Sequence, residues 1–483
     1  MVSLSFIKNI KYLDKILLDK NSNIITHSIS DINFIKGHNL FINKYKILNA
    51  KNFYFLFYFK LIKNLLFFFL YCLYKIILSF NYKKINNINK RNDVIFISHY
   101  VEYIKDDNYK NDFYYSSIPY ILSKNNISNS IIYFKDKKYK KKYNINSKNS
   151  FFRYKISFIS ILKIIISIIK EFFRLISINN INKNHKKIIS LCILNLFKIS
   201  TLKNNIVAYE FENNIKLLKP KIVIITHEGH PFERLFFNIA KKYKIPCIGY
   251  VTGIFLPFQY GNNRDLKINF NPDYISYQSN IIKSLSNDKI KTKKIILGNK
   301  RNAEISFNNT KEYLPMKILV IPEGLIDEEL FFFKNVFSFA KENKNINYRI
   351  RLHPLSDFKK ILKKLKITKI PNNITLSNNN IDSDLEICNF ALYRGSTAII
   401  HAAKNRLIPL YLKKYNEISI NPLYKLEKNI IVINNFESIS SIYLDKNFAK
   451  KYEIKLKKIT QYCKEYFEEI NIKPIIKILN INV

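Results

Sequence analysis

Three short polar clusters in this 483-residue chain carry side chains that can do chemistry. They are Thr-His-Glu-Gly-His at 226–230, Arg-Leu-His-Pro at 351–354 and Arg-Gly-Ser-Thr at 394–397. Each directly follows a short apolar run with the length and composition of a buried β-strand. Ligands of parallel α/β sheets bind at the carboxyl ends of the strands, so we expect these clusters to form the functional site.

In the first cluster, Glu228 is the candidate general base. A carboxylate at a strand end can take the proton from an acceptor hydroxyl. His227 and His230 flank it and would tune or orient it, while Gly229 allows the turn into a helix that begins at Pro231. The cluster contains residue types that bind metals, but no second cluster of His or Cys accompanies it, so we expect no metal.

The second cluster ends a strand pattern in which Arg349 and Arg351 alternate with apolar residues and share one face. We expect Arg351 to contact the donor phosphate. The pattern closes at His353 and Pro354. A histidine in this place can donate a hydrogen bond to a nucleotide phosphate or act as an acid toward the leaving group. A surface histidine before a turn is the alternative interpretation.

In the third cluster, Gly395 lets a strand turn sharply into a helix, and Ser396 and Thr397 can donate hydroxyl groups to a phosphate. The N-terminus of that helix offers free N–H groups and a favourable dipole for an anion. Arg394 could add a bidentate contact to a phosphate or to a sugar carboxylate. A simple helix cap would account for the same residues without a ligand.

A Glu-Gly pair at Glu323 and Gly324 repeats the arrangement of Glu228 and Gly229 in the second half of the chain. Glu323 is therefore an alternative base, or a loop residue near a cleft between domains. The chain contains no GxGxxG, Walker A or GxSxG motif, which argues against dinucleotide oxidoreductases, P-loop enzymes and α/β hydrolases.

Apolar runs that alternate with helical patterns must position these clusters, and this alternation indicates parallel sheets in α/β domains. The first series of strands is expected at 93–100, 129–136, 219–230, 244–253, 272–280 and 293–301. After a polar stretch at 302–315 the series restarts at 316–324, 348–354, 373–379, 390–393, 408–412 and 429–435. We therefore expect two tandem Rossmann-like domains, at 91–310 and 311–435. A partly apolar helical extension would precede them at 1–90, and a helical tail would follow at 436–483.

The formal charge of +44 comes from lysines spread through the whole chain. Lys, Asn, Ile, Phe and Tyr are abundant, whereas Gly (8), Met (2) and Trp (0) are scarce, as an A/T-rich coding sequence would produce. No zinc-finger, RRM or KH signature is present, so we do not expect a nucleic-acid partner. A basic excess favours anionic partners such as phospholipid surfaces or nucleotide substrates.

The five cysteines point to a reducing compartment, because they are far apart, odd in number and form no CxxC pair. They are Cys72, Cys192, Cys247, Cys388 and Cys463, and most have apolar neighbours that predict buried thiols. The first residues lack the apolar region and cleavage site of a signal peptide. We expect a cytoplasmic location.

Two segments, 52–80 and 156–178, are very apolar but are interrupted by charged residues. Neither reaches about 18 uncharged residues, the length typical of a membrane-spanning helix. Burial in a protein core is one interpretation. The other is that the helices lie in a membrane interface with their lysines toward lipid phosphates, which would add peripheral contact with the cytoplasmic face of the inner membrane.

The order of the motifs resembles that of bacterial sialyltransferases and related capsule or lipopolysaccharide transferases, which are GT-B enzymes that use CMP-activated acidic sugars. The segment from 227 to 250 is also similar to surface-carbohydrate biosynthesis proteins of bacterial polysaccharide loci. The resemblance covers about 93–435. It departs from those families at two places: a single acid precedes Gly229, and Val251-Thr252-Gly253 stands where Gln-His would be expected.

This resemblance implies that Glu228 is the general base, that His353 contacts the CMP phosphate and assists its departure, and that Ser396 and Thr397 bind that phosphate. The first domain would bind the acceptor and the second the donor.

The expected reaction is an inverting, metal-independent transfer of an acidic sugar from a CMP donor to a bacterial surface glycan, carried directly or on a lipid. No cofactor is implied apart from the nucleotide-sugar co-substrate. Two alternatives remain open: a CDP-polyol or a UDP- or GDP-sugar donor on the same fold, and a non-catalytic membrane-surface protein of polysaccharide assembly.

Overall fold

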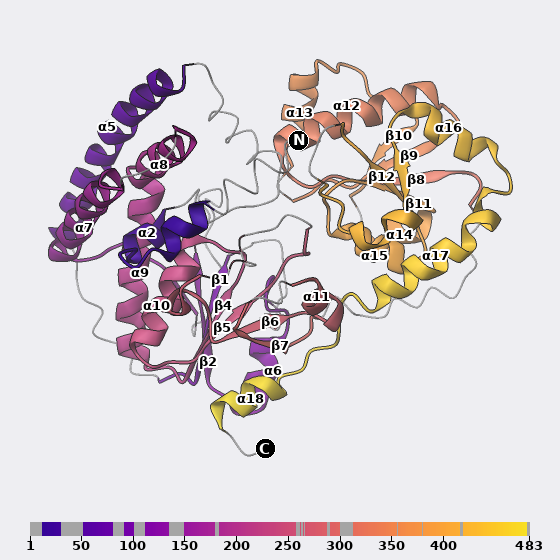
Figure 1. Cartoon of the computed structure of the whole chain (residues 1–483). Coiled ribbons are helices and arrows are strands. Elements are labelled where there is room, and N and C mark those ends of the chain that lie inside the picture. The colour runs from indigo at the N-terminus through magenta and orange to yellow at the C-terminus, as the bar shows by residue number, and fades with distance from the viewer. Residues whose placement is uncertain are drawn as a thin grey trace.

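Two parallel β-sheets, each covered by helices, form two α/β domains in tandem (Figure 1). The computed structural model describes residues 12–29, 52–80, 91–100, 112–134, 149–178, 183–256, 261, 264, 266–286, 290–299, 313–354, 356–378, 380–415 and 419–480. This architecture confirms the expected α/β class with two tandem Rossmann-like domains, the arrangement termed GT-B. The predicted boundaries at 90/91 and 310/311, and most of the charged loop after 136, lie outside the described residues.

The first sheet has seven parallel strands in the order β3-β2-β1-β4-β5-β6-β7. Its central strands are near-continuous apolar runs because helices cover both faces. The strands are β1 (Val94–His99), β2 (Asn129–Phe134), β3 (Ser150–Phe151), β4 (Ile222–Thr226), β5 (Cys247–Tyr250), β6 (Tyr274–Tyr277) and β7 (Lys293–Ile296). The helices of this domain include α6 (Ile118–Lys124), α9 (Ile199–Leu218), α10 (Pro231–Lys242) and α11 (Asn280–Leu285).

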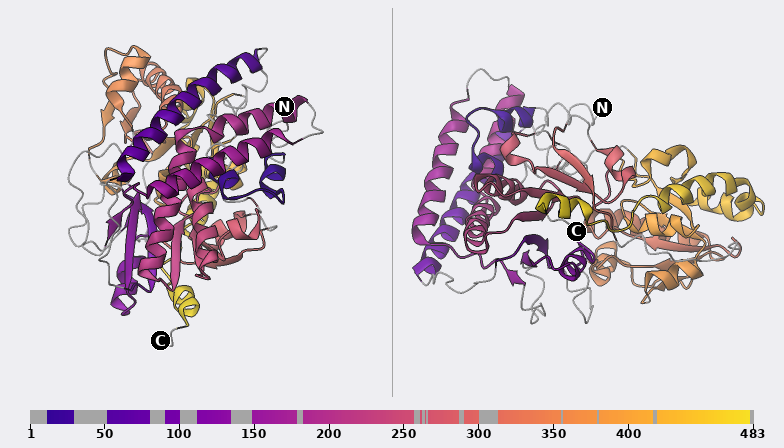
Figure 2. Two further views of the ribbon diagram at one scale, coloured as in Figure 1. Left: turned by 90° about the vertical axis from the view of Figure 1, so that its left-hand side faces the viewer. Right: turned by 90° about the horizontal axis from the view of Figure 1, so that it is seen from below.

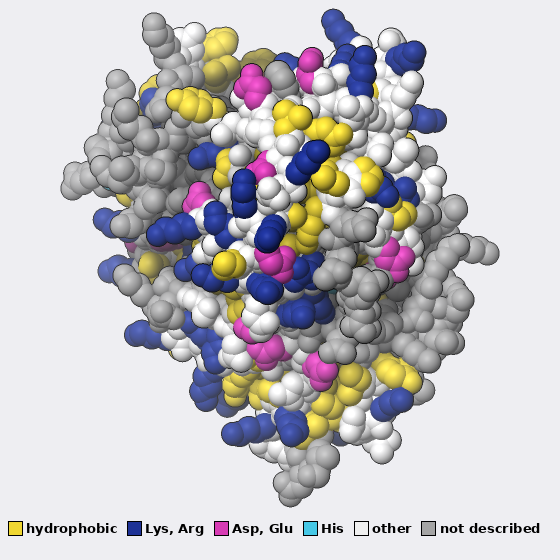
Figure 3. Space-filling view, turned by 90° about the vertical axis from the view of Figure 1, so that its right-hand side faces the viewer, with side chains coloured by type: hydrophobic (Ala, Val, Ile, Leu, Met, Phe, Trp, Pro, Cys, Tyr) yellow, Lys and Arg dark blue, Asp and Glu magenta, His cyan; other side chains and the backbone are white. Residues whose placement is uncertain are grey.

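The second sheet has six parallel strands in the order β10-β9-β8-β11-β12-β13. The strands are β8 (Lys317–Ile321), β9 (Asn347–Ile350), β10 (Ile374–Leu376), β11 (Phe390–Tyr393), β12 (Ile408–Leu412) and β13 (Ile431–Ile433). The helices are α12 (Ile326–Glu342), α13 (Phe358–Leu365), α14 (Ile381–Ile387), α15 (Ala398–Lys404), α16 (Phe436–Leu444) and α17 (Phe448–Lys464). Lys and Arg side chains are spread over this side of the molecule, with acidic groups among them (Figure 3).

Both sheets reverse their strand order at the same point of the fold. In the first domain the reversal lies between β1 and β4, and in the second between β8 and β11. A crevice opens outside the carboxyl ends of the strands at such a switch point. The two sheets therefore each offer one ligand-binding edge.

Long helices form a layer against the first domain, on the side away from the second domain (Figures 1 and 2). They are α5 (Phe53–Phe80), α7 (Phe158–Ile176) and α8 (Lys183–Leu196), which pack with α9 around one apolar core. The interpretation of the apolar segments as buried helices is wrong for α5, because only 17% of its most apolar stretch is buried. Among the described residues α5 alone is long and apolar enough to cross a membrane.

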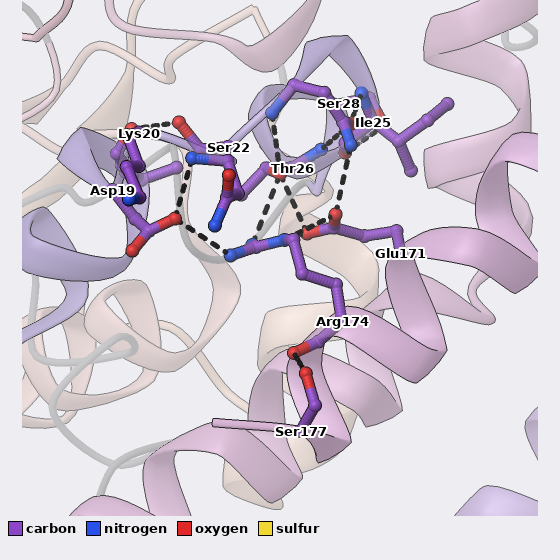
Figure 4. Close-up of polar contacts among 12 residues, drawn as sticks. Asp19, Lys20, Ser22, Ile25, Thr26, Ser28, Glu171, Arg174 and Ser177 are labelled. Carbon is purple, nitrogen blue, oxygen red and sulfur yellow. Dashed lines mark hydrogen bonds and ion pairs between the residues drawn. The ribbon is translucent and has the colours of Figure 1, made fainter. Parts of the chain in front are cut away.

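A buried acid explains the charge in the middle of the apolar helix α7. The Glu171 carboxylate accepts hydrogen bonds from Thr26 Oγ1 at 2.7 Å and from Asn23 Nδ2 at 3.2 Å. It also accepts a bond of 2.7 Å from Arg174 Nη2 (Figure 4). Asn23 caps the short helix α2 (Ile24–Ser28), so this cluster attaches the N-terminal segment to α7.

The end of the chain joins both domains. Helix α17 packs against α15 on the second domain, whereas α18 (Lys473–Leu479) returns to the first, where Ile475 and Leu479 enter the core under β1 (Figure 2). Backbone hydrogen bonds attach the segment between α17 and α18 to the first domain, among them the bond from Asn471 N–H to the Leu297 carbonyl at 2.9 Å. All five cysteines are buried free thiols, as predicted.

Candidate functional site between the two domains

A cavity of about 1170 Å³ lies between the domains and is lined from both switch points. Seven of the residues singled out in the sequence line it: Glu228, His230, Glu323, His353, Gly395, Ser396 and Thr397. Five do not: His227, Gly229, Gly324, Arg351 and Arg394. Clusters more than a hundred residues apart in the sequence thus share one cavity, which is large enough for a nucleotide-sized ligand.

Glu228 reaches the cavity from the loop after β4. Its carboxylate accepts a hydrogen bond of 3.0 Å from Thr252 Oγ1, and its other oxygen lies 3.7 Å from His230 Nε2. About a quarter of each side chain of this acid-imidazole pair is exposed. A carboxylate held in this way can accept a proton from a hydroxyl group bound beside it.

Glu233, in the first turn of α10, holds the loop that carries Glu228. It is fully buried and accepts backbone N–H bonds from Glu228 at 3.1 Å, Gly229 at 2.7 Å and His230 at 3.0 Å. Burial raises the pKa of Glu233 to about 7. His227 Nδ1 lies 3.4 Å from the same carboxylate and is buried, so His227 braces the loop rather than facing the cavity.

Aromatic and imidazole rings form the rest of the first-domain wall. The ring of His230 stacks on Phe232 with centroids 5.1 Å apart, and His99 lies 5.7 Å from Phe232 and 5.0 Å from Phe134. Flat apolar rings beside a few polar groups are typical of small-molecule sites and suit a sugar ring. Sequence reasoning missed His99 and Phe134, although they are the last residues of β1 and β2 and lie near the ends of predicted strands.

Two glycines shape the second-domain wall. Gly324 has a φ of +77°, and a Cβ there would collide with the imidazole of His353. A Cβ at Gly395 would collide with the carboxylate of Glu323. His353 and Glu323 therefore lie against bare backbone at the carboxyl edge of the second sheet. Burial lowers the pKa of His353, which makes it a neutral hydrogen-bonding group at pH 7.

Glu329, in the first turn of α12, holds this second loop as Glu233 holds the first. It accepts hydrogen bonds from the backbone N–H of Gly324 and from the hydroxyl of Ser356, just after the His353 cluster. Burial raises the pKa of Glu329. Both domains thus use a buried acid in the first turn of a helix to fix a Glu-Gly loop.

Two of the expected phosphate-binding residues, Arg394 and Arg351, do not line the cavity and form ion pairs instead. Arg394 is buried, 2.9 Å from Glu328 Oε2, and it donates to the Leu412 carbonyl at 2.8 Å. Arg351 Nη1 lies 2.9 Å from Asp384, which is also buried. Each arginine pairs with a buried carboxylate, and such a carboxylate needs a charged partner.

Ser396 and Thr397 provide the polar side chains of the Arg-Gly-Ser-Thr cluster that line the cavity, beside Gly395. Thr397 makes no side-chain capping bond to α15, so the simple-cap interpretation does not account for it. Helix α15 has only seven residues, so the hydroxyl groups rather than a long helix dipole are the candidate anion contacts.

No group of three or more His, Cys, Asp or Glu side chains converges on a metal-binding geometry in the part of the chain that the structure describes. The hydroxyl, imidazole and carboxylate groups in the cavity suit hydrogen bonding to a phosphorylated sugar compound.

No family model and no curated protein matches this chain. Similar solved structures include UDP-GlcNAc 2-epimerase from Neisseria meningitidis, which is 12% identical with a TM-score of 0.44 and covers 80% of this chain and 100% of its own. MurG from Acinetobacter baumannii is 8% identical with a TM-score of 0.40, covering 80% and 99%. Trehalose 6-phosphate synthase from Burkholderia multivorans is 6% identical with a TM-score of 0.43, covering 80% and 98%. Similarity at this level carries no information about activity.

Proposed function

We propose that this chain is a metal-independent glycosyltransferase that moves a sugar from a nucleotide-linked donor to an acceptor hydroxyl. The observation that carries the proposal is the shared cavity. Glu228 stands on its first-domain wall, and His353, Ser396 and Thr397 stand on its second-domain wall. A base on one side and phosphate-binding groups on the other are what a displacement between an acceptor and a nucleotide requires.

In this reaction Glu228 takes the proton of the acceptor hydroxyl as its oxygen attacks the anomeric carbon of the donor sugar. The bond from that carbon to the phosphate oxygen breaks on the opposite face, so the configuration inverts. His353 and the two hydroxyl groups donate hydrogen bonds to the departing phosphate. Glu323 accepts hydrogen bonds from hydroxyl groups of the donor, because a carboxylate beside a phosphate would repel it.

The donor we propose first is a CMP-linked acidic sugar, and the acceptor is a surface glycan, on the strength of the motif order. A UDP- or GDP-linked sugar or a CDP-polyol would fit the same cavity. Positioning by the cleft would supply much of the rate enhancement for any of these donors.

The direct test is donor turnover by the wild type and by Glu228→Gln, followed as nucleotide release with water or an added glycan as acceptor. Loss of a general base lowers the rate by about 10²–10⁴-fold, which we expect for Glu228→Gln. Glu323→Gln is the matched control, and it should weaken donor binding more than turnover. Full turnover in Glu228→Gln would contradict the assignment of the base, and no turnover with any donor would favour a non-catalytic assembly protein.

A further inference from the structure

Helices α5 and α7 expose apolar side chains that lie outside the hydrophobic core of the protein. Large side chains among them are more than half exposed: Phe55 (73%), Ile62 (68%), Phe69 (60%) and Ile77 (65%) on α5, and Ile159 (64%) and Phe173 (64%) on α7. A contiguous apolar surface of this kind on a folded protein marks an interaction site. We refer to these outer faces of α5 and α7 as the apolar plate.

The plate is held rigidly by the opposite faces of the same helices. Phe68 and Cys72 of α5 and Ile161 and Ile164 of α7 are buried in one core with α8 and α9. The last residue of α5 meets the first of α7, since the rings of Phe80 and Phe158 stack with centroids 5.8 Å apart. The outward residues are therefore presented by folded helices.

The charged side chains beside the apolar plate indicate what kind of surface it binds. Helix α5 contains no acidic residue, and the one acid of α7, Glu171, is fully buried. The exposed charged side chains along the two helices include Lys63, Lys163 and Lys170. Apolar side chains flanked by lysines match a bilayer whose lipid headgroups are anionic, because the lysines meet phosphates while the apolar groups enter the interface.

Polar contacts on the inner side of α5 favour a helix that lies on the bilayer over one that spans it. Asn64 Nδ2 donates to the Leu194 carbonyl at 2.9 Å, and Lys75 Nζ donates to the Tyr154 carbonyl at 2.9 Å. Both bonds would be lost if α5 left the protein to cross a membrane, and their polar groups would face hydrocarbon.

We propose that the apolar plate seats the protein on an anionic lipid bilayer as a peripheral membrane protein. The inner side of α5 also contacts the first-domain wall of the cavity, because Lys203 and Tyr154 line that cavity and both contact this helix. Lys203 Nζ lies 5.4 Å from the centroid of Tyr71 on α5. If the proposed transferase activity holds, this adjacency suits an acceptor carried on a lipid.

The test is co-sedimentation of the full chain with vesicles of phosphatidylcholine and phosphatidylglycerol, and with vesicles of phosphatidylcholine alone. We expect binding to the anionic vesicles, reduced at high salt. The double variant Ile62→Asp/Ile159→Asp should bind them at least tenfold more weakly. Leu444→Asp/Ile454→Asp, at apolar positions of the second domain that are at least as exposed, is the matched control and should bind like the wild type.

Equal vesicle binding by the plate variant and the wild type, or no binding by the wild type, would overturn the proposal. So would a concentration-dependent dimer that only the plate variant disrupts, because the plate would then contact a second copy. Thermal stability and nucleotide binding of the plate variant should be unchanged. The membrane proposal and the transferase proposal can therefore fail separately.

Discussion

Acidic side chains in this protein differ in role according to their burial. Glu228 and Glu323 line the cavity, whereas Glu233, Glu328 and Glu329 are buried and hold loops or an arginine in place. Glu228 and Glu323 closely follow strands in the sequence, whereas the other three lie in first turns of helices, so residue type and spacing could identify the two candidates for chemistry. Only the packed structure separates the acids that can meet a ligand from those that position them.

Breaking the buried pair of Arg394 and Glu328 should destabilise the protein strongly. Glu328→Gln leaves the Arg394 guanidinium buried without its charged partner, which typically costs about 3–5 kcal/mol of unfolding free energy. Urea denaturation of wild type and variant measures this cost. A direct phosphate contact by Arg394 would give a different result: Arg394→Met would weaken nucleotide binding while leaving the unfolding free energy almost unchanged.

Glu210 should make stability fall as the pH rises toward neutrality. Its two oxygens accept backbone N–H bonds from Arg153 at 2.6 Å and Tyr154 at 2.8 Å, yet burial raises its pKa to about 7. The native state therefore keeps a proton that the unfolded chain releases at about pH 4.3. The contribution is fully present below that pH and is lost as the pH rises through 7.

The side chain in Glu210→Gln does not ionise, so the variant lacks this pH-dependent contribution to the free energy of unfolding. The difference in unfolding free energy between wild type and Glu210→Gln should therefore change by an amount on the order of 1–3 kcal/mol between pH 4.5 and pH 7.5. Denaturation at several pH values measures it. A pH-independent difference would mean that Glu210 is ionised throughout this range.

At the scale of elements, the two Glu-Gly loops are built alike. Each loop follows a strand that lies beside the switch point of its sheet, β4 in the first domain and β8 in the second. Each loop contains a glycine with positive φ, and an acid of the following helix accepts its backbone hydrogen bonds. The loops of Gly229 and Gly324 are thus fixed before any ligand arrives, which is how a site becomes preorganised.

Gly324→Ala should lower activity without unfolding the protein. The new Cβ would collide with the imidazole of His353 and would sit on a backbone with φ of +77°, at a cost of about 1–2 kcal/mol. We expect turnover to fall at least tenfold. Thermal unfolding of the variant is the control, because it separates a displaced His353 from a loss of the fold. Wild-type turnover by Gly324→Ala would show that His353 does not depend on this contact.

Most elements could be predicted from the sequence, because strands buried on both faces are unbroken apolar runs. All the strands expected in the two domains are present, whereas β3, with only two residues, left no pattern to detect. The exposure of α5 could not be predicted, since an apolar helix has the same composition whether protein or lipid covers it. Arg394 and Arg351 looked like phosphate ligands because their buried partners, Glu328 and Asp384, lie far from them in the sequence.

At the scale of the whole molecule, two sheets with the same strand order face one cavity, and the C-terminal helix α18 crosses back to the first domain. Residues from both domains must therefore be held together for the site to exist. The apolar plate lies on the opposite side of the first domain from the second domain (Figures 1 and 2). A bilayer contact there would leave the second domain free of the membrane.

The central claim is that this cavity binds a nucleotide through His353, and thermal unfolding of the purified protein with CMP, UDP, GDP or buffer tests it most directly. A ligand that binds only the native state stabilises it by about 2.7 kcal/mol at a hundredfold excess over its Kd. We predict that CMP raises the melting temperature of the wild type, and that His353→Ala unfolds at the wild-type temperature in buffer but loses the response. A response to UDP or GDP would keep the site and change the donor. No response to any nucleotide, or an undiminished response in His353→Ala, would contradict the claim.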